Sequence, residues 1–437
     1  MAKNNIKGNS FNFKGSINVP ADKSIGHRAL FLAALNEGKM TEITNLALTE
    51  DIRTISKDIQ STINCLAHIG IQFAEVKGKI FVKGRGIKKL VAAPNNLHCE
   101  NSGTTARLLM GLLSGQKFDS IIDGDESLKK RPMKRVVEPL QQMGANINSE
   151  DNLLPIEINS AELNGEKFEL NLGSAQVKTA IILAALNAKD VTTIKDSMPS
   201  RDHTEIMLSH FTKNLKVKDG IIYITPDPII NLEVINIPGD PSSAAFFIVG
   251  ALINPGSDLE LKNICLNPTR IHYIDILKEM GGKIEITNSS EINGELVGDI
   301  QVKSSDLNAI DINKESIPFL IDELPILSLA CALASGKSKI SGADELRYKE
   351  SDRIKTTVSQ LKILGASIEE TNDGMIIEGG NNLVGAVCES FGDHRIAMMN
   401  SIAGTIASGE TTINESDSVA VSFPNFYELL DSFKKRD

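Results

Sequence analysis

The sequence has 437 residues, more than one ordinary domain holds, so we expect two domains. Hydrophobic residues make up 41% and charged residues 23%, which is typical of a globular protein with a large core. A net charge of −10, no Trp and only four Tyr argue against nucleic-acid binding, which uses basic surfaces and stacking rings. The longest apolar stretches, such as residues 244–253, are far too short to span a membrane.

Cysteine and histidine usage points to a reducing compartment. The N-terminal residues MAKNNIKGNS lack the apolar core of a secretory signal. The five cysteines are scattered and form no CxxC pair, and the seven histidines show no HExxH spacing. We therefore expect a cytoplasmic protein with free thiols, without a structural metal and without a disulfide framework.

An Ala-rich apolar helix recurs six times along the chain, at spacings of roughly 65–80 residues. Its copies fall at residues 29–38, 107–115, 180–189, 244–253, 324–336 and 395–409. More amphipathic helices that end near glycine lie between copies, most clearly at 132–144, 271–281 and 351–365, and a β-like run follows each one. Each unit thus alternates strands and helices, which predicts an α/β fold with three units in each of two domains. A chance recurrence of Ala- and Leu-rich helices is the alternative.

The domain boundary is predicted in the Pro- and Gly-containing stretch 237–241, between the third and fourth units.

Seven short polar segments stand where predicted helices begin, and free N–H groups at a helix start favour anions. Lys23, Ser24 and Arg28 in the first segment offer the donors that a phosphate or carboxylate needs. The other segments are 101–105, 124–132, 174–178, 200–203, 346–353 and 392–395. Each could be an ordinary helix cap, but their repetition at equivalent places favours one shared anion-binding cleft. The net charge is an average, so it does not exclude such a local site.

One acidic segment differs from these. Asp322 and Glu323 interrupt the apolar stretch 317–325 before the fifth Ala-rich helix. A buried carboxylate there is costly unless cations or hydrogen bonds hold it. Asp322 is therefore either a helix cap or a general base facing the basic cleft.

These segments resemble the EPSP synthase family of enolpyruvyltransferases almost from end to end. The resemblance is carried, in the family's order, by the stretches DKSIGHRAL, NSGTTARL, RPM, SAQVKTA, SRDHTE, GDPSSAAFF, IDELPIL, RYKESDRI, GDHRIAM and VSFPNF. It implies a two-domain inside-out α/β barrel, each domain built from three βαβαββ repeats with helices inside. It also implies that residues 21–239 form one domain, that residues 1–20 join 240–437 in the other, and that the active site lies in the cleft between them.

The resemblance further implies a reaction. The enolpyruvyl group of phosphoenolpyruvate would pass to the 5-hydroxyl of shikimate 3-phosphate, with release of phosphate, on the route to chorismate and the aromatic amino acids. Such a transfer needs an acid/base pair and many cations, but no cofactor and no metal. The implied partners are these two small molecules, and the family expectation for the assembly is a monomer.

Site residues follow from the same resemblance. Asp322 would take the 5-hydroxyl proton, and Glu350, alone or together with Lys23, would protonate C3 of the enolpyruvyl group. The implied ligands of shikimate 3-phosphate are Lys23, Ser24, Arg28, Ser174, Ala175, Gln176, Ser200, Arg201, Asp322 and Lys349. Those of phosphoenolpyruvate are Lys23, Gly103, Arg131, Gln176, Arg353 and Arg395. Val421 and Glu345 stand where the best-studied branch has a Lys and an Asn ligand, so neither is included.

Two alternatives compete with this interpretation. UDP-N-acetylglucosamine enolpyruvyltransferases share the fold, but they pair the first Lys with Asn and use a loop Cys. Here Ser24 follows Lys23, and no cysteine lies in 119–131. A non-catalytic phosphometabolite-binding protein would have lost the acid/base residues, whereas Asp322 and Glu350 are both present.

Overall fold

The computed structural model describes residues 2–47, 55–171, 173–198 and 200–435. The chain forms two compact units. Unit 1 contains residues 1–20, 238–290 and 296–437, and unit 2 contains residues 21–237 and 291–295. The short segment 291–295 thus belongs to unit 2, although unit 1 contains the chain on either side of it.

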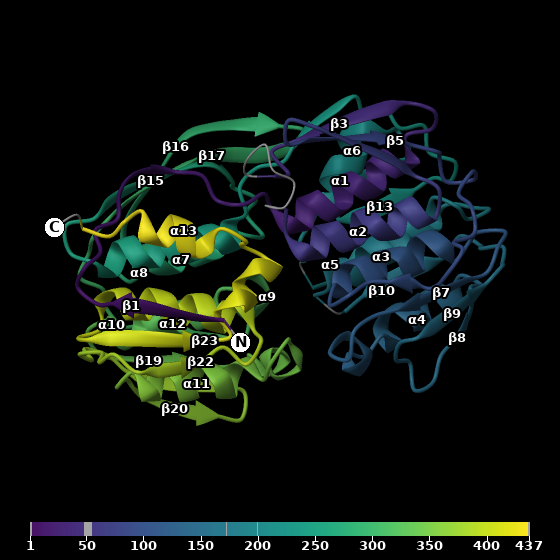
Figure 1. The fold of residues 1–437 in the computed structure, drawn as a ribbon. Coiled ribbons are helices and arrows are strands. Elements are labelled where there is room, and N and C mark those ends of the chain that lie inside the picture. Colours follow the sequence, from purple (N-terminus) through teal and green to yellow (C-terminus); the bar gives the residue numbers. More distant parts are fainter. Residues whose placement is uncertain (1, 48–54, 172, 199, 436–437) are drawn as a thin grey trace. The chain divides into compact units, whose positions relative to one another are not determined.

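Unit 2 contains three four-stranded sheets, with strand orders β14-β3-β5-β4, β6-β7-β9-β8 and β10-β11-β13-β12 (Figure 1). The strands are β3 (Met40–Thr44), β4 (Gln72–Val76), β5 (Lys79–Lys83), β6 (Leu97–His98), β7 (Ser120–Asp123), β8 (Asn146–Asn148), β9 (Ile156–Asn159), β10 (Lys167–Leu170), β11 (Thr192–Asp196), β12 (Leu215–Lys218), β13 (Ile221–Ile224) and β14 (Val234–Asn236). The helices are α1 (Lys23–Leu35), α2 (Lys57–His68), α3 (Gly103–Leu113), the 3-10 helix η2 (Leu128–Lys130), α4 (Lys134–Gln142), α5 (Ala175–Ala185) and α6 (His203–Phe211).

Unit 1 also contains three sheets, with strand orders β16-β17-β15-β2, β18-β19-β21-β20 and β1-β23-β22. The strands are β1 (Lys3–Lys7), β2 (Lys14–Ile17), β15 (Asp258–Cys265), β16 (Lys283–Ile292), β17 (Glu295–Lys303), β18 (Asp311–Ile312), β19 (Lys337–Ile340), β20 (Ser367–Thr371), β21 (Gly374–Glu378), β22 (Val387–Glu389) and β23 (Glu410–Asn414). The helices are α7 (Pro241–Ile253), α8 (His272–Glu279), α9 (Ile317–Leu320), α10 (Leu324–Leu333), α11 (Arg353–Ile363), α12 (His394–Ile406), α13 (Phe426–Asp431) and the 3-10 helices η3 (Asp344–Tyr348) and η4 (Ser416–Val421).

Several of the sheets share one internal plan. In β6-α3-β7-α4-β8-β9, the strand before the Ala-rich helix pairs parallel with the strand after it, and the last two strands pair antiparallel. The same βαβαββ order recurs in β10-α5-β11-α6-β12-β13. In unit 1 two of the sheets include a strand from the N-terminal region: β2 pairs parallel with β15, and β1 pairs antiparallel with β23.

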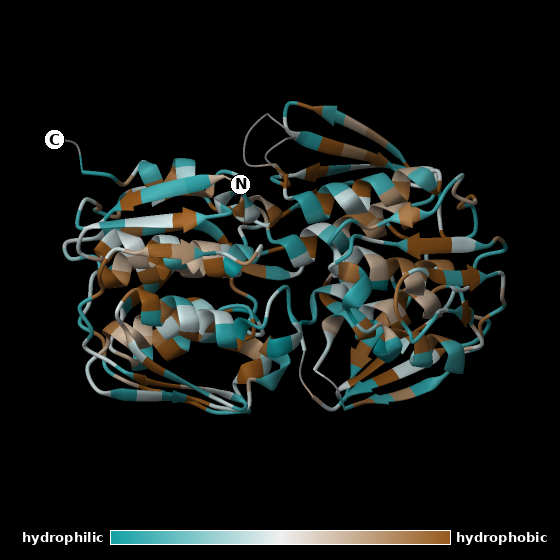
Figure 2. Cartoon of the chain, turned by 60° about the horizontal axis from the view of Figure 1, so that its bottom comes forward, coloured by the Kyte–Doolittle hydropathy of each residue, from teal (hydrophilic) through white to brown (hydrophobic). Residues whose placement is uncertain are grey.

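Each of the six Ala-rich segments lies largely in a helix, which confirms the six predicted helices, although most of the predicted segments run two to four residues past the helix end. They are α1, α3, α5, α7, α10 and α12, and nearly every residue after their first turn is buried. A helix that is apolar on all sides must be covered on all sides, so the sheets surround these helices (Figure 1). Hydrophilic and hydrophobic residues alternate along many outer strands, as expected for sheets with one buried face (Figure 2).

Small residues let the central helices approach closely. A Cβ added to Gly111 of α3 would lie 2.2 Å from the carbonyl oxygen of Ala180 in α5, so this contact requires glycine.

The predicted helix starts were less accurate. α1 and α3 begin several residues before the predicted Ala-rich segments, and α4 begins at Lys134, after the predicted start at Pro132.

All five cysteines are buried and free. Among the described residues, none of the helices combines the length and apolar character that a membrane span needs.

Candidate functional site

The predicted site residues of unit 2 lie at or near helix starts. α1 begins at Lys23, and its N-cap Asp22 accepts a hydrogen bond from the Ile25 amide at 2.8 Å. α3 begins at Gly103, where the Ser102 hydroxyl accepts from the Thr105 amide. α5 begins directly after Ser174. These N-termini leave backbone N–H groups beside the predicted anion ligands, as the sequence indicated.

Arg28 of α1 makes hydrogen bonds to α5 and α6 within unit 2. Its side chain donates from Nε to Thr204 Oγ1 at 2.7 Å and from Nη2 to Thr179 Oγ1 at 2.9 Å. Its Nη1 donates to the Ser24 carbonyl oxygen at 2.9 Å. Arg201 donates to the Ser24 hydroxyl at 3.2 Å. The structure therefore brings together Ser24, Arg28 and Arg201, three of the residues that the resemblance assigns to shikimate 3-phosphate.

A second group forms around the start of α3. Arg131 donates to Asn101 Oδ1 at 2.6 Å, and Gln176 donates from Nε2 to Thr104 Oγ1 at 2.9 Å. A Cβ at Gly103 would lie 2.9 Å from Nη1 of Arg107 and 3.6 Å from Nη1 of Arg131. Glycine thus leaves room beside two guanidinium groups. Gly103, Arg131 and Gln176 are brought together, as predicted.

Lys23 and Ser200 are each held by a carboxylate. Lys23 Nζ lies 2.7 Å from Asp58 Oδ2 of α2. The Ser200 hydroxyl donates to Asp196 Oδ2 at 2.9 Å, and that same oxygen lies 2.7 Å from the buried Lys178 Nζ. These carboxylates orient two of the predicted substrate-binding side chains.

Buried hydroxyls connect α1, α2 and α3. His27 is fully buried, and its Nδ1 lies 2.7 Å from Thr62 Oγ1, which lies 2.7 Å from Thr105 Oγ1. Burial, together with the nearby charges of Lys23 and Arg28, holds the pKa of His27 well below its usual value. His27 is therefore a neutral imidazole between two cations at neutral pH.

The predicted site residues of unit 1 gather around Asp322, which lies between α9 and α10. Arg353 Nη1 lies 3.4 Å from Asp322 Oδ1, and Arg395 Nη2 lies 3.4 Å from Asp322 Oδ2. Arg395 also donates from Nη1 to the Asp322 carbonyl oxygen at 3.0 Å. Glu350 Oε2 lies 2.5 Å from Arg353 Nη2. Four predicted residues therefore form one cluster of alternating charge.

Arg353 lies at the centre of this cluster and is 1% exposed. Its Nε donates to Asp393 Oδ2 at 2.8 Å, and Asp393 also caps α12 by accepting from the Arg395 amide. Burial alone would lower the pKa of Arg353, but Asp393, Glu350 and Asp322 raise it above its usual value. Burial likewise opposes ionisation of Asp393, but Arg353 holds its pKa below the usual range. This pair is charged at any physiological pH.

Lys349 is less closely connected to this cluster. Its described contact is with Glu345 Oε1, at 3.3 Å, in the 3-10 helix η3.

The helix-cap alternative for Asp322 is not what the structure shows. The N-cap of α10 is Glu323, and Asp322 precedes it.

Sequence reasoning missed several charged residues that support the site. Arg107 is buried and donates to Gln176 Oε1 at 2.7 Å. Asp58, Lys178 and Asp393 hold Lys23, Asp196 and Arg353 in the contacts above. Arg107 and Lys178 had a usable signal, because each is a single charge within an otherwise apolar helix, where a buried charge needs a partner.

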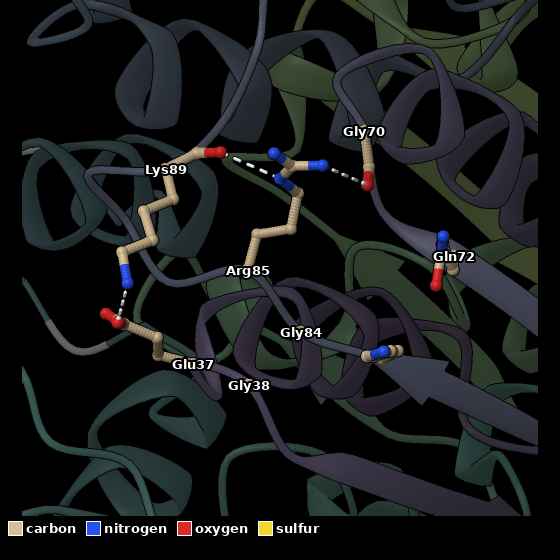
Figure 3. Close-up of a pocket in the computed structure, with 8 residues that line it drawn as sticks. Glu37, Gly38, Gly70, Gln72, Gly84, Arg85 and Lys89 are labelled. Carbon is tan, nitrogen blue, oxygen red and sulfur yellow. Dashed lines mark hydrogen bonds and ion pairs between the residues drawn. The ribbon is translucent and has the colours of Figure 1, made fainter.

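A surface hollow of about 370 Å³ at the opposite end of α1 contains none of the predicted site residues (Figure 3). Arg85 donates to the carbonyl oxygens of Lys89 at 2.8 Å and Gly70 at 3.5 Å, and Lys89 pairs with Glu37. α1 is 13 residues long, so this hollow is about 18 Å from Lys23 along the helix. Lys89 and Glu37 neutralise each other, and Arg85 is held by backbone carbonyls, so this hollow is a poor candidate for the functional site.

Solved structures with the same architecture are EPSP synthases. Two structures of the enzyme from Acinetobacter baumannii match this chain with TM-scores of 0.87 and 0.86, at 40% and 39% identity. Both matches cover 99% of this chain and 98% of the other. The prediction of a two-domain α/β fold of this class is confirmed.

Sequence comparison gives the same family. The family model described as EPSP synthase (3-phosphoshikimate 1-carboxyvinyltransferase) matches residues 9–430. A 3-phosphoshikimate 1-carboxyvinyltransferase of Thermoanaerobacter sp. (strain X514) is 47% identical over 420 residues, covering 96% of this chain and 97% of that protein. One of Desulforamulus reducens is 44% identical over 420 residues, covering 95% and 96%. The chain belongs to the EPSP synthase family.

Proposed function

We propose that the chain transfers the enolpyruvyl group of phosphoenolpyruvate to the 5-hydroxyl of shikimate 3-phosphate and releases phosphate. This is a step toward chorismate and the aromatic amino acids. Family membership over nearly the whole chain supports it. The observation that carries it at the residue level is the Asp322 carboxylate between Arg353 and Arg395, with Glu350 bound to the same Arg353.

The assignments in unit 2 concern substrate binding. Shikimate 3-phosphate is bound by residues around the start of α1, α5 and α6: Lys23, Ser24, Arg28, Ser174, Ala175, Gln176, Ser200 and Arg201. Gly103 and Arg131, together with Lys23 and Gln176, bind phosphoenolpyruvate. Helix N-termini and guanidinium forks suit these anions, because both supply several hydrogen-bond donors in fixed directions.

The assignments in unit 1 concern proton transfer and the second substrate. Asp322 accepts the proton of the 5-hydroxyl, and Glu350, alone or together with Lys23, protonates C3 of phosphoenolpyruvate. Arg353 and Arg395 bind phosphoenolpyruvate, and Lys349 contributes to the binding of shikimate 3-phosphate. Arg353 and Arg395 also fix the orientation of the Asp322 carboxylate.

The reaction proceeds in two steps, an addition and an elimination. Addition of the 5-hydroxyl oxygen to C2 of phosphoenolpyruvate, with protonation of C3, gives a tetrahedral ketal phosphate. Elimination then removes phosphate from C2 and one proton from C3, which restores the double bond. The arginines stabilise the negative charge that the departing phosphate carries. We propose no metal, cofactor or covalent enzyme intermediate for this path.

The setting that fits this function is the cytoplasm, since buried free thiols suit a reducing compartment. We propose that the protein works there as a monomer on these two small molecules, without nucleic acid or a membrane as partner.

Phosphate release tests this function directly. Purified protein is mixed with phosphoenolpyruvate and shikimate 3-phosphate, and a parallel reaction contains UDP-N-acetylglucosamine as the acceptor. We expect release only with shikimate 3-phosphate. Release only with the UDP-sugar would assign the chain to the other enolpyruvyl transfer. No release with either acceptor would refute the enzyme function and leave the alternative of a non-catalytic binding protein. An increase in melting temperature with shikimate 3-phosphate would detect such binding.

A further inference from the structure

Glu323 directly follows Asp322 and is 2% exposed, yet no step of the proposed reaction uses it. It occupies the N-cap of α10, where a carboxylate usually accepts a hydrogen bond from its own helix. Its side chain makes no such bond. A buried carboxylate that does not cap its helix needs partners elsewhere.

Those partners lie at the start of α7. The Ser242 hydroxyl donates a short hydrogen bond to Glu323 Oε1. Arg270 donates from Nη2 to Ser242 Oγ at 3.1 Å and to Asp240 Oδ1 at 2.9 Å. Asp240 caps α7 by accepting from the Ser242 amide at 2.8 Å. Glu323 is therefore bound to a buried, charged network that is anchored on a different helix.

The same network reaches Asp322 through the backbone. The amide of Glu323 donates to the Leu320 carbonyl oxygen at 2.8 Å, and its carbonyl oxygen accepts from the Leu327 amide at 2.9 Å. The peptide group that joins Asp322 to Glu323 is held on its other side by Arg395, which donates to the Asp322 carbonyl oxygen. A shift of Glu323 would move this peptide and turn the Asp322 carboxylate relative to Arg353 and Arg395.

We propose that Glu323 is a positioning residue for the enolpyruvyl transfer: through Ser242 it ties the turn that carries Asp322 to the start of α7. This proposal rests on the proposed function and on the assignment of Asp322 as the base. Such a role would explain why an ionic network lies where a well-packed apolar cluster would often be as stable.

The first test uses Glu323→Gln, which keeps the shape of the side chain, and Ser242→Ala, which removes the hydroxyl. Both should lower kcat by ~10–100-fold, because small misplacements of a reacting group have effects of that size. The KM values of both substrates, and the calorimetric affinity for shikimate 3-phosphate, should stay within about threefold of wild type. Ser242→Thr retains a hydroxyl and should restore most of the turnover. Glu315→Gln makes the same chemical change on an exposed residue and should change nothing.

The second test asks whether Glu323 acts through Asp322. If it does, adding Glu323→Gln to Asp322→Asn should not reduce the residual turnover further, since the group being positioned is already inactive. Normal kcat in Glu323→Gln would overturn the proposal. The proposal would also be overturned if Glu323→Gln reduced kcat by the same factor in the Asp322→Asn background as in the wild type. It would likewise be overturned if the loss of kcat matched the fraction of protein that is unfolded, as measured by thermal unfolding. An inactive wild-type protein would instead refute the proposed function, and near-normal turnover of Asp322→Asn would remove the base assignment.

Discussion

Arg28 in unit 2 and Arg353 in unit 1 are held in different ways. In unit 2, Arg28 donates to the hydroxyls of Thr204 and Thr179 and to a backbone carbonyl. In unit 1, Arg353 donates to the carboxylates of Asp393 and Glu350. A neutral acceptor orients a guanidinium without cancelling its charge, whereas a carboxylate orients it and neutralises it. The difference suggests that Arg28 keeps more of its charge for an anion, whereas much of the charge of Arg353 is spent on holding acidic side chains.

The strongest test of this comparison concerns Asp322. We expect Asp322→Asn to reduce turnover by ~10³-fold or more, because the amide cannot accept the hydroxyl proton, while the affinity for shikimate 3-phosphate stays close to wild type. Phosphate release and titration calorimetry measure the two quantities. Near-normal turnover would mean that the unit 1 cluster does not contain the base.

Arg353 should be needed for stability as well as activity. Arg353→Met leaves the fully buried Asp393 carboxylate without its main partner, which should cost about 3–5 kcal/mol of unfolding free energy. Denaturant titration measures this cost. Arg347→Met is the matched control, since Arg347 forms more exposed ion pairs with Asp352 and Glu370 and should lose no more than about 1 kcal/mol. Equal losses in the two variants would contradict the distinction.

Arg28 should show the opposite profile. Arg28→Gln leaves behind hydroxyls that can bond to each other, as Thr179 and Thr204 already do at 2.6 Å, so the loss of stability should be smaller than for Arg353→Met. Binding of shikimate 3-phosphate should weaken by ~10–100-fold, because a charge-assisted hydrogen bond is lost. Calorimetry measures the affinity, and Arg85→Gln, in the surface hollow, should leave it unchanged. Unaltered binding by Arg28→Gln would remove Arg28 from the phosphate subsite.

The smallest expected effect is a pH dependence that comes from His27. Its pKa is lowered in the folded protein, so below about pH 6.5 the unfolded chain binds a proton that the folded one does not. Stability should therefore fall as the pH drops below this value, by up to ~1.4 kcal/mol per pH unit. His27→Gln should flatten the change in melting temperature between about pH 7.5 and pH 5.5 relative to wild type. An unchanged slope would show that His27 becomes protonated without cost.

Much of the fold was predictable because the strongest constraints are local. The Ala-rich pattern identifies α1, α3, α5, α7, α10 and α12, since a helix that is apolar on all sides has to be central. The polar residues at their starts identified Ser24 and Arg28, which lie together at the start of α1, and Gly103 beside Arg131 at the start of α3. Helix limits were harder to predict, because the polar first turns of α1 and α3 interrupt the apolar pattern.

The direction of a buried side chain was not predictable from the hydrophobic pattern alone, and the choice of Asp322 as the acid that faces the cations came from the family resemblance. Asp322 and Glu323 are adjacent acids in the same apolar stretch, and sequence patterns do not say which one faces the cations. The structure separates them, because Asp322 lies against Arg353 and Arg395 whereas Glu323 bonds to Ser242. That choice depends on α7, about 80 residues earlier in the chain, and on the packing of two helices that no local pattern describes.

The pairing of β1 with β23 has a consequence for synthesis on the ribosome. Strand β1 is made about 400 residues before its partner β23, so at ordinary elongation rates roughly 20–80 s separate the synthesis of the two strands. Residues 21–237 supply nearly all of unit 2 and emerge well before unit 1 is complete. During that interval β1 has to remain unpaired without attracting other chains. Its sequence, KNNIK, lowers the risk of aggregation while β1 is unpaired, because two lysines and two asparagines make a poor template for strand pairing with other chains.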